Sequence, residues 1–402
     1  MIAPPSSLPT LRLKPKAEAR RLRHGAPWAW ADELVLDRRS RAIPAGALAI
    51  LEDADRRPVG VGVATVEAKI AFRMLDRDAT ALIDADWLRA RIGAALDLRQ
   101  KLFDAPYYRL VHAEGDALPG LIVDRFGETL VIQPNAIWLE ERLGMLSEIL
   151  ADLTGCTTLI KNGSGRARAA EGLAEETAVL RGAAPEGPIP VPMNGATYMA
   201  DVMAGQKTGL FYDQRFNHGV AARLAREARV LDVFSHVGGF ALACLAGGAT
   251  GALAVDASEP ALDLALAGAR AMGRAADLAT RRGDAFAVME ALEQEGESFD
   301  LVIADPPAFA PSKPALEKGL RAYERVARLA APLVAPGGVL ILCSCSHAAD
   351  LGKFRAACLR GIGRAGRVPR LIYTGFAGPD HPQHPDLSET GYLKVLAFRL
   401  LP

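Results

Sequence analysis

Residues 230–240, with the sequence VLDVFSHVGGF, decide the predicted fold of this chain. The apolar residues at its start predict a buried strand that carries Asp232 inside it. Gly238 and Gly239 then allow the backbone to turn tightly and to begin a helix. A strand, a glycine turn and a helix in this order form the place where an α/β sheet holds a nucleotide-like cofactor.

Strands and helices alternate over residues 188–402. Strands are expected at residues 229–235, 251–256, 279–282, 299–305, 338–344, 368–374 and 392–400. Helices are expected at about 238–249, 259–273, 284–294, 315–335 and 348–364. This alternation predicts a doubly wound, mostly parallel, Rossmann-like α/β sheet. Only a loop separates the last two strands, so they should form an antiparallel hairpin, unlike the ordinary dinucleotide-binding order.

The amino-terminal part of the chain predicts a small, mainly β module. Basic side chains crowd residues 10–24, and Trp28 and Trp30 follow, on one face if the backbone is extended. Further strand-like runs lie at residues 47–52, 59–66 and 69–74. A basic edge beside an aromatic pair suits contacts with RNA, and a solvated surface explains such a run equally well.

An α+β middle domain is predicted over residues 79–187. Helical spacing at 85–103 and 138–153 alternates with strand-like runs, and no catalytic constellation is visible. The glycine- and arginine-rich residues 162–170 are expected to form a mobile basic loop. Four prolines in residues 185–192 indicate a linker. The expected domains are therefore 1–78, 79–187 and 188–402.

Composition excludes several classes of protein. The 402 residues include 47 basic and 47 acidic side chains, so any contact with nucleic acid must use a local patch. Five cysteines, an odd number, argue against a disulfide scaffold. The chain has no apolar run long enough for a membrane span and no secretory signal at its start. We expect a soluble cytoplasmic protein that does not bind a membrane.

Polar residues at the ends of successive predicted strands indicate the cofactor. Asp256 can accept the two hydroxyls of a ribose, Asp284 an adenine amino group, and Phe286 can cover the adenine ring. The turn Ser-His-Val-Gly-Gly-Phe lacks the G-x-G-x-x-G pattern that a pyrophosphate needs, which argues against NAD. The pattern favours S-adenosyl-L-methionine. The expected binding residues in these segments are Asp232, Phe234, Ser235, Gly238, Gly239, Phe240, Asp256, Ala257, Ser258, Asp284, Ala285, Phe286, Asp305 and Pro306.

Residues 342–347, LCSCSH, follow the fifth predicted strand of this sheet and carry a candidate nucleophile. Cys343, Cys345 and His347 supply at most three ligands, too few for a structural metal site, so no metal is expected. Cys343 is still inside the strand and should pack in the core. Cys345 lies just beyond it, where a thiol could reach a substrate. His347 is either a helper base or a surface histidine.

A thiol is the nucleophile that methylation of a pyrimidine ring carbon requires. The C5 carbon of cytosine is a poor nucleophile until a thiolate adds at C6. A free thiol is only a few per cent ionised at neutral pH, so nearby groups must favour the thiolate. Cys345 and Asp305, the latter in the segment DPPAF, are the catalytic candidates.

Residues 205–215, GQKTGLFYDQR, together with LDVFSHVGGF, DPPAFA and CSCSH, resemble the bacterial class I ribosomal RNA large-subunit (cytosine-5-)methyltransferases. The resemblance covers nearly the whole chain and implies an N-terminal PUA RNA-binding domain, a middle domain and a methyltransferase domain. It implies methyl transfer from S-adenosyl-L-methionine to C5 of a cytosine in large-subunit rRNA, with Cys345 as the nucleophile. The residues that it places in the wall of the cleft are Gln206, Thr208, Phe211, Asp213 and Arg215.

One segment departs from this family pattern. Residues 235–237, Ser-His-Val, stand where an aromatic residue and a threonine are more usual before the glycines. Two other functions stay open: methylation of an amino group of guanine or adenine in RNA, and a non-catalytic RNA-binding factor in ribosome assembly. A homodimer is a possible assembly.

Overall fold

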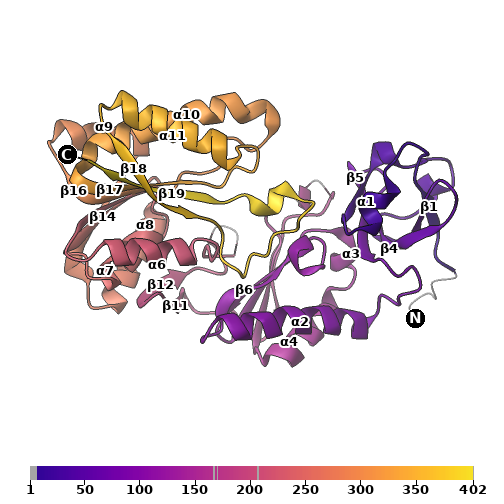
Figure 1. Ribbon diagram of the computed structural model, residues 1–402. Coiled ribbons are helices and arrows are strands. Elements are labelled where there is room, and N and C mark those ends of the chain that lie inside the picture. Colours follow the sequence, from indigo (N-terminus) through magenta and orange to yellow (C-terminus); the bar gives the residue numbers. More distant parts are fainter. Residues whose placement is uncertain (1–6, 166–167, 170, 206–207, 402) are drawn as a thin grey trace. The chain divides into compact units, whose positions relative to one another are not determined.

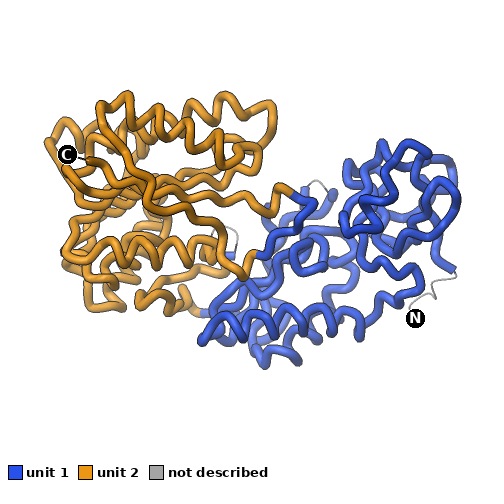
Figure 2. The backbone as a smooth tube through the Cα atoms, in the orientation of Figure 1, with its two compact units in different colours: residues 1–185, 206–208, 382–387 blue, residues 186–205, 209–381, 388–402 orange. Residues whose placement is uncertain are grey.

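The computed structural model describes residues 7–165, 168–169, 171–205 and 208–401. The chain divides into two compact units, each of which is described by itself (Figure 2). Unit 1 contains residues 1–185, 206–208 and 382–387, and unit 2 contains residues 186–205, 209–381 and 388–402. No helix in the described ranges is both long enough and apolar enough to span a membrane.

The first sheet of unit 1 has the strand order β1-β3-β4-β5-β2. Its strands are β1 (Thr10–Arg12), β2 (Trp28–Trp30), β3 (Ala47–Glu52), β4 (Pro58–Ala64) and β5 (Ile70–Asp76), and helix α1 (Ala19–Arg23) lies between β1 and β2 in the chain. β1 is parallel to β3, and the other pairs are antiparallel. The rings of Trp28 and Trp30 meet edge to face with centroids 5.7 Å apart, which agrees with the predicted extended backbone.

The second sheet of unit 1 has the order β10-β9-β8-β7-β6. Its strands are β6 (Tyr107–His112), β7 (Leu121–Phe126), β8 (Thr129–Pro134), β9 (Thr158–Asn162) and β10 (Thr177–Arg181). Its helices are α2 (Ala85–Leu102), α3 (Ile137–Glu140) and α4 (Leu143–Thr154). The prediction of one helix over residues 138–153 is therefore wrong, because two helices, α3 and α4, occupy this stretch. Trp138 is fully buried and donates its indole N–H to the Pro119 carbonyl, which anchors α3 separately from α4.

Arg168 corrects the expectation of a basic loop at residues 162–170. Its side chain is buried, and its guanidinium donates to Glu140 at 2.9 Å and to the Ala174 carbonyl at 2.8 Å. A buried guanidinium needs such partners, because an unpaired charge is costly in the interior. These hydrogen bonds of Arg168 therefore contribute to the stability of unit 1. Residues 166, 167 and 170 lie outside the described part of the chain.

The proline-rich residues 185–192, predicted as a linker, include most of a strand. β11 (Ile189–Met193) pairs antiparallel with β12 (Ala196–Ala200) in a two-stranded sheet. Pro190 and Pro192 are exposed, while Val191 and Met193 are buried, which is the alternation of a half-buried strand. Proline has no N–H to donate, and an edge strand tolerates this because one side of it has no partner.

Unit 2 contains a seven-stranded sheet of order β15-β14-β13-β16-β17-β19-β18. Its strands are β13 (Arg229–Val233), β14 (Gly251–Asp256), β15 (Leu278–Arg282), β16 (Phe299–Ala304), β17 (Val334–Ser344), β18 (Pro369–Gly375) and β19 (Lys394–Leu400). The first five in chain order are parallel, and β19 is antiparallel to both β17 and β18. The predicted fold class and its terminal antiparallel hairpin are confirmed.

Helices cover both faces of this sheet, as a doubly wound fold requires. They are α6 (Arg215–Leu224), α7 (Gly239–Ala246), α8 (Glu259–Ala271), α9 (Ala285–Gln294), α10 (Leu316–Ala330) and α11 (Leu351–Arg364). Figure 1 shows α9, α10 and α11 over one face and α6, α7 and α8 over the other. The central strand β16 is buried except at Asp300, which explains its nearly continuous apolar sequence.

The core around β19 provides a test of this packing. Leu396 is completely buried, whereas Leu371 on the neighbouring strand β18 is 42% exposed. We expect Leu396→Ala to lower the free energy of unfolding by about 2–5 kcal/mol, because it removes buried methyl groups and leaves a cavity. Leu371→Ala, the matched control, should cost less than about 1 kcal/mol. Urea denaturation measures both, and equal losses would contradict the described burial.

Candidate active site

The glycine turn after β13 places three residues in the left-handed backbone region. Phe234 has φ 63°, His236 has φ 51° and Gly238 has φ 77°. A Cβ at Gly238 would lie 2.9 Å from Ala265 Cβ, and one at Gly239 would lie 2.9 Å from His218 Nε2. Both glycines are therefore needed for close packing inside unit 2, and Gly238 also for its backbone angle.

Two buried polar atoms at this turn have no hydrogen-bond partner among the described residues: Asp232 Oδ1 and Ser235 Oγ. Asp232 Oδ2 accepts from the Ala241 N–H at 2.9 Å, so the carboxylate is held at the start of α7. Burial raises the pKa of Asp232 to about 8; the Ala241 N–H opposes this, and the carboxylate of Asp305 adds to it. Unpartnered buried polar atoms fit a ligand that supplies the missing groups.

Asp256, at the end of β14, is fixed by backbone groups. Its Oδ2 accepts from the His236 N–H and its Oδ1 from the Ser258 N–H, each at 2.8 Å. Each carboxylate oxygen can accept further hydrogen bonds, so these contacts orient Asp256 without using it up. Ser258 caps helix α8 by accepting from the Ala261 N–H, and Ala257 is exposed between them.

The acid after β15 also caps a helix. Asp284 Oδ1 accepts from the Ala287 N–H at 3.0 Å at the start of α9. Ala285 is buried, and the ring of Phe286 lies 6.2 Å from Phe234 and 6.3 Å from Phe309. The structure thus brings Phe286, which was expected to cover an adenine ring, into one cluster with Phe234 and Phe309.

Residues of the 205–215 motif are divided between the units. Gln206 lies outside the described residues. Thr208 belongs to unit 1, is buried, and donates its hydroxyl to Asp124 Oδ2 at 2.5 Å. Asp124 also accepts two hydrogen bonds from Arg109. Thr208 is thus anchored within unit 1, and its place in the wall of the cleft stays a prediction.

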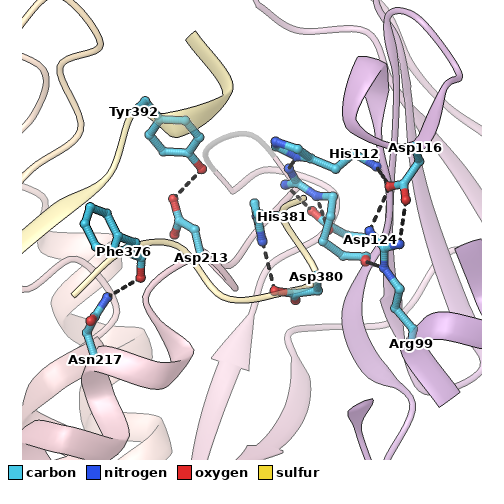
Figure 3. A network of polar contacts seen from close by, with 11 residues as sticks. Arg99, His112, Asp116, Asp124, Asp213, Asn217, Phe376, Asp380, His381 and Tyr392 are labelled. Carbon is cyan, nitrogen blue, oxygen red and sulfur yellow. Dashed lines mark hydrogen bonds and ion pairs between the residues drawn. The ribbon is translucent and has the colours of Figure 1, made fainter. Parts of the chain in front are cut away.

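Asp124 belongs to a buried charge network that the sequence analysis missed. Figure 3 shows it together with Arg99, His112 and Asp116. The Arg99 guanidinium donates to both oxygens of Asp116, at 2.6 and 2.7 Å, and the His112 N–H donates to Asp116 Oδ2 at 2.6 Å. The signal available in the sequence was the group of charged residues within residues 99–124. Which of these residues pair with one another depends on the fold.

Three further motif residues lie in unit 2. The ring of Phe211 meets that of His236 edge to face at 5.0 Å, beside the glycine turn. Asp213 Oδ2 accepts from the Tyr392 hydroxyl at 2.7 Å, as Figure 3 shows. Arg215 begins α6, and burial lowers the pKa of its guanidinium, which lies over the Tyr212 ring.

Phe240 is buried in the first turn of α7, where its ring meets the His218 ring with centroids 4.5 Å apart. Burial lowers the pKa of His218 to about 3, so this imidazole is neutral at physiological pH. The buried rings of Phe240 and His218 thus pack against each other next to the glycine turn.

Cys345 is the one cysteine of the chain that is not buried; all five are described. Its Sγ lies 3.9 Å from the Pro306 carbonyl oxygen, beside the DPPAF segment. The next residue, Ser346, is fixed because its hydroxyl accepts from the Ala310 N–H at 2.9 Å and bonds the Tyr323 hydroxyl at 2.7 Å. The thiol is thus held on a rigid segment of unit 2.

Asp305 meets a residue that the sequence analysis did not select. Gln214 donates its amide N–H to Asp305 Oδ2 at 2.9 Å. His347, for which the sequence left open a helper base or a surface histidine, is exposed. Among the described residues, no group of three potential metal ligands lies together.

Lys394 is a second residue that the sequence analysis did not select. It is buried at the start of β19, opposite Ser344 of β17, and its ammonium donates to the Ser346 carbonyl at 2.6 Å. Burial lowers its pKa to about 8, an effect opposed by nearby Cys345 and Asp350. The signal in the sequence was a lysine within the predicted strand 392–400, whose other residues are mostly apolar. A buried ammonium beside a thiol favours the thiolate.

Removal of this charge should slow the chemistry of the thiol. We expect Lys394→Met to reduce the rate of iodoacetamide alkylation of Cys345 at pH 7.5 by roughly tenfold, because the reactive species is the thiolate. The other four thiols are buried and should stay unmodified, so mass spectrometry of the intact protein reads the rate directly. Lys353→Met, which removes an exposed lysine of α11, is the control. An unchanged rate in Lys394→Met would contradict this electrostatic role.

Comparisons with known proteins agree with this geometry. A family model described as S-adenosylmethionine-dependent methyltransferase matches residues 177–399, and a PUA-like domain model matches residues 11–77. The chain is 32% identical to "Ribosomal RNA large subunit methyltransferase I" of Aeromonas salmonicida over 86% of this chain and 88% of that protein. It is also 32% identical to "Ribosomal RNA large subunit methyltransferase" of Deinococcus radiodurans over the full length of both.

A solved structure from Streptococcus mutans, assigned to the SAM-dependent methyltransferases, covers 98% of this chain and 100% of its own with a TM-score of 0.81. At 18% identity this match shows a shared fold. None of these matches supports the homodimer, which stays a prediction. The sheet order, the family model and the full-length relatives agree. The chain therefore belongs to the S-adenosylmethionine-dependent ribosomal RNA large subunit methyltransferase family with an N-terminal PUA-like domain.

Proposed function

We propose that this protein methylates C5 of a cytosine in large-subunit rRNA through a covalent adduct with Cys345. The observation that carries the proposal is the position of Cys345. It is the single cysteine that is not buried, it follows β17 at the carboxyl edge of the sheet, and its Sγ faces the carbonyl of Pro306. The names of the relatives support rRNA as the substrate.

The residues at the glycine turn fit S-adenosylmethionine. The unpartnered Asp232 Oδ1 suits its ammonium group, and the unpartnered Ser235 Oγ suits its carboxylate. Asp256 and Asp284, both oriented by backbone N–H groups, suit the ribose hydroxyls and the adenine amino group. When bound, this cofactor supplies an electrophilic methyl group. The other cofactor residues expected from the sequence and described in unit 2 complete the proposed site.

The proposed reaction begins at the thiolate of Cys345. The thiolate adds to C6 of the cytosine, forming an S–C6 bond and moving the C5–C6 electron pair to C5. With S-adenosylmethionine bound, the electron pair on C5 would form the new C–C bond to the methyl group, while the methyl–sulfur bond would break and leave its electron pair on the sulfur, which becomes a neutral thioether. A base removes the C5 proton, the C5–C6 double bond returns, and the thiolate leaves. Lys394 favours the anionic sulfur at the first and last steps, and Asp305 holds the amino edge of the base.

The DPPAF segment bears on the alternative of amino-group methylation. That reaction needs an aromatic side chain that stacks on the target base. Here Phe309 packs against the Tyr323 ring with centroids 5.1 Å apart and is only partly exposed, behind exposed Ala308. A ring that packs against the core in this way is poorly placed to stack on a target base, which supports ring-carbon methylation.

The proposed domain roles follow the predicted boundaries: RNA binding by 1–78, substrate shaping by 79–187 and catalysis by 188–402. Several basic residues of the amino-terminal arm are already paired, for example Arg21 with Glu33 and Arg23 with Asp53. Lys16 and Arg20 are exposed and suit phosphate contacts. An rRNA substrate places the proposed activity in the cytoplasm.

The nucleophile is tested by substitution. We expect Cys345→Ala to lower methyl transfer to rRNA from labelled S-adenosylmethionine by about 10³-fold or more, because the other four cysteines are buried and cannot replace this nucleophile. Cys358→Ala, at a buried cysteine of α11, should retain transfer. RNA containing 5-fluorocytidine should form a stable adduct with the wild type alone, since fluorine cannot leave as a proton does. Full activity in Cys345→Ala would refute the thiol mechanism.

Product analysis separates the alternatives. Digestion of the methylated RNA to nucleosides should yield 5-methylcytidine. An N-methylated purine would support the amino-group reading. Absence of any transfer, with RNA binding retained, would support a non-catalytic assembly factor.

The role of Asp232 predicts proton release. Its pKa of about 8 means that the carboxyl is mostly protonated at pH 7, and pairing with an ammonium group requires the ionised form. Cofactor binding at pH 7 should therefore release close to one proton, and affinity should tighten as pH rises from 6 to 7. Calorimetry in two buffers of different ionisation enthalpy measures this. Asp232→Asn should release none, whereas Asp263→Asn, at an exposed site on α8, should behave as the wild type.

A further inference from the structure

A chain of hydrogen bonds leads to the carboxylate of Asp305 from the edge of the sheet in unit 2. The Tyr373 hydroxyl on β18 donates to Asn217 Oδ1 at 2.9 Å. Asn217 Nδ2 donates to Gln214 Oε1 at 2.8 Å, and Gln214 Nε2 donates to Asp305 Oδ2 at 2.9 Å. We call Tyr373, Asn217 and Gln214 the amide relay.

One backbone carbonyl sets the direction of the amide relay. Asn217 Nδ2 also donates to the Phe376 carbonyl at 3.1 Å, a contact drawn in Figure 3. A carbonyl can only accept, so the Nδ2 group of Asn217 must face it, and its Oδ1 must face Tyr373. The second hydrogen of Nδ2 then requires Gln214 to present Oε1 to Asn217 and Nε2 to Asp305. Along this series of hydrogen bonds, each residue donates to the next one in the direction of Asp305.

The packing shows that these contacts constrain the local sequence. Gln214 and Asn217 are both buried. A Cβ at Gly375 would lie 2.1 Å from Asn217 Oδ1 and 2.7 Å from the Tyr373 hydroxyl. Only glycine at this position leaves room for the relay. Buried amides with all their contacts satisfied are rigid, and aligned hydrogen bonds strengthen one another.

We propose that the amide relay is a positioning device for Asp305, which fixes its rotamer and keeps its Oδ2 a hydrogen-bond acceptor. A carboxylate held in this way accepts from the exocyclic amino group of cytosine and cannot donate to the carbonyl that uracil carries there. The relay therefore contributes to the choice of an amino-bearing pyrimidine. This inference rests on the proposed function for the role of Asp305.

The first test does not need turnover. Aspartate labelled with ¹³C at the carboxyl carbon is titrated by NMR, and the Asp305 signal is assigned with Asp305→Asn. In Gln214→Glu a second carboxylate faces Asp305, and in Gln214→Leu the donor is lost, so the midpoint for Asp305 should move to higher pH in both. Gln133→Leu, at a buried glutamine of β8 in unit 1, should leave it unchanged. Identical Asp305 midpoints in the wild type, Gln214→Glu, Gln214→Leu and Gln133→Leu would overturn the relay.

The second test measures methyl transfer. Gln214→Leu should lower kcat by about 10- to 100-fold with cofactor affinity within about twofold of the wild type, which also verifies folding. Asn217→Asp and Tyr373→Phe should lower kcat by successively smaller factors. The acid limb of the pH profile in Gln214→Glu should move upward. Loss of cofactor binding in step with kcat in every variant would show a merely structural role and overturn the proposal.

The two tests separate the relay from the proposed function. A moved Asp305 midpoint, with no methyl transfer to cytosine by the wild type, would overturn the proposed function and support the relay. An unmoved midpoint with normal cytosine methylation would do the reverse.

Discussion

Parallel pairing of β13 with β16, and of β16 with β17, is the constraint on which the site depends. In this register Val233 pairs with Ala304, and Ala304 pairs with Leu342. The residues that follow each strand therefore emerge at one edge, where the glycine turn, the DPPAF segment and Cys345 meet. Backbone hydrogen bonds, rather than any contact between the functional side chains, bring these segments together.

Burial then gives the edge its chemical character. Asp232 and Lys394 carry opposite charges when ionised, and burial shifts the pKa of both to about 8, toward their neutral forms. In the proposed function each gains a partner of opposite charge: the cofactor ammonium for Asp232 and the Cys345 thiolate for Lys394. Under that proposal, the charges that the site binds or forms offset the desolvation of these two groups.

Local patterns in the sequence predicted the elements of the fold better than its polar contacts. Alternation of apolar runs predicted every strand of the sheet in unit 2, and the glycine pair predicted the turn. The prediction of a linker over residues 185–192 missed strand β11, which begins at Ile189, because an edge strand tolerates proline. Thr208 with Asp124, Gln214 with Asp305, and Tyr373 with Asn217 are 84, 91 and 156 residues apart. No local pattern encodes such pairs, since they depend on how whole elements pack.

The antiparallel insertion of β19 between β17 and β18 affects the order in which the chain can fold during its synthesis. β18 leaves the ribosome before β19, yet in the described sheet its hydrogen-bonded neighbour is β19. It must wait unpaired until β19 arrives and closes that edge. Lys394 arrives on the same strand. The neighbourhood of Cys345 is therefore assembled last, so a nascent chain carries Cys345 without the Lys394 ammonium nearby until the sheet is complete.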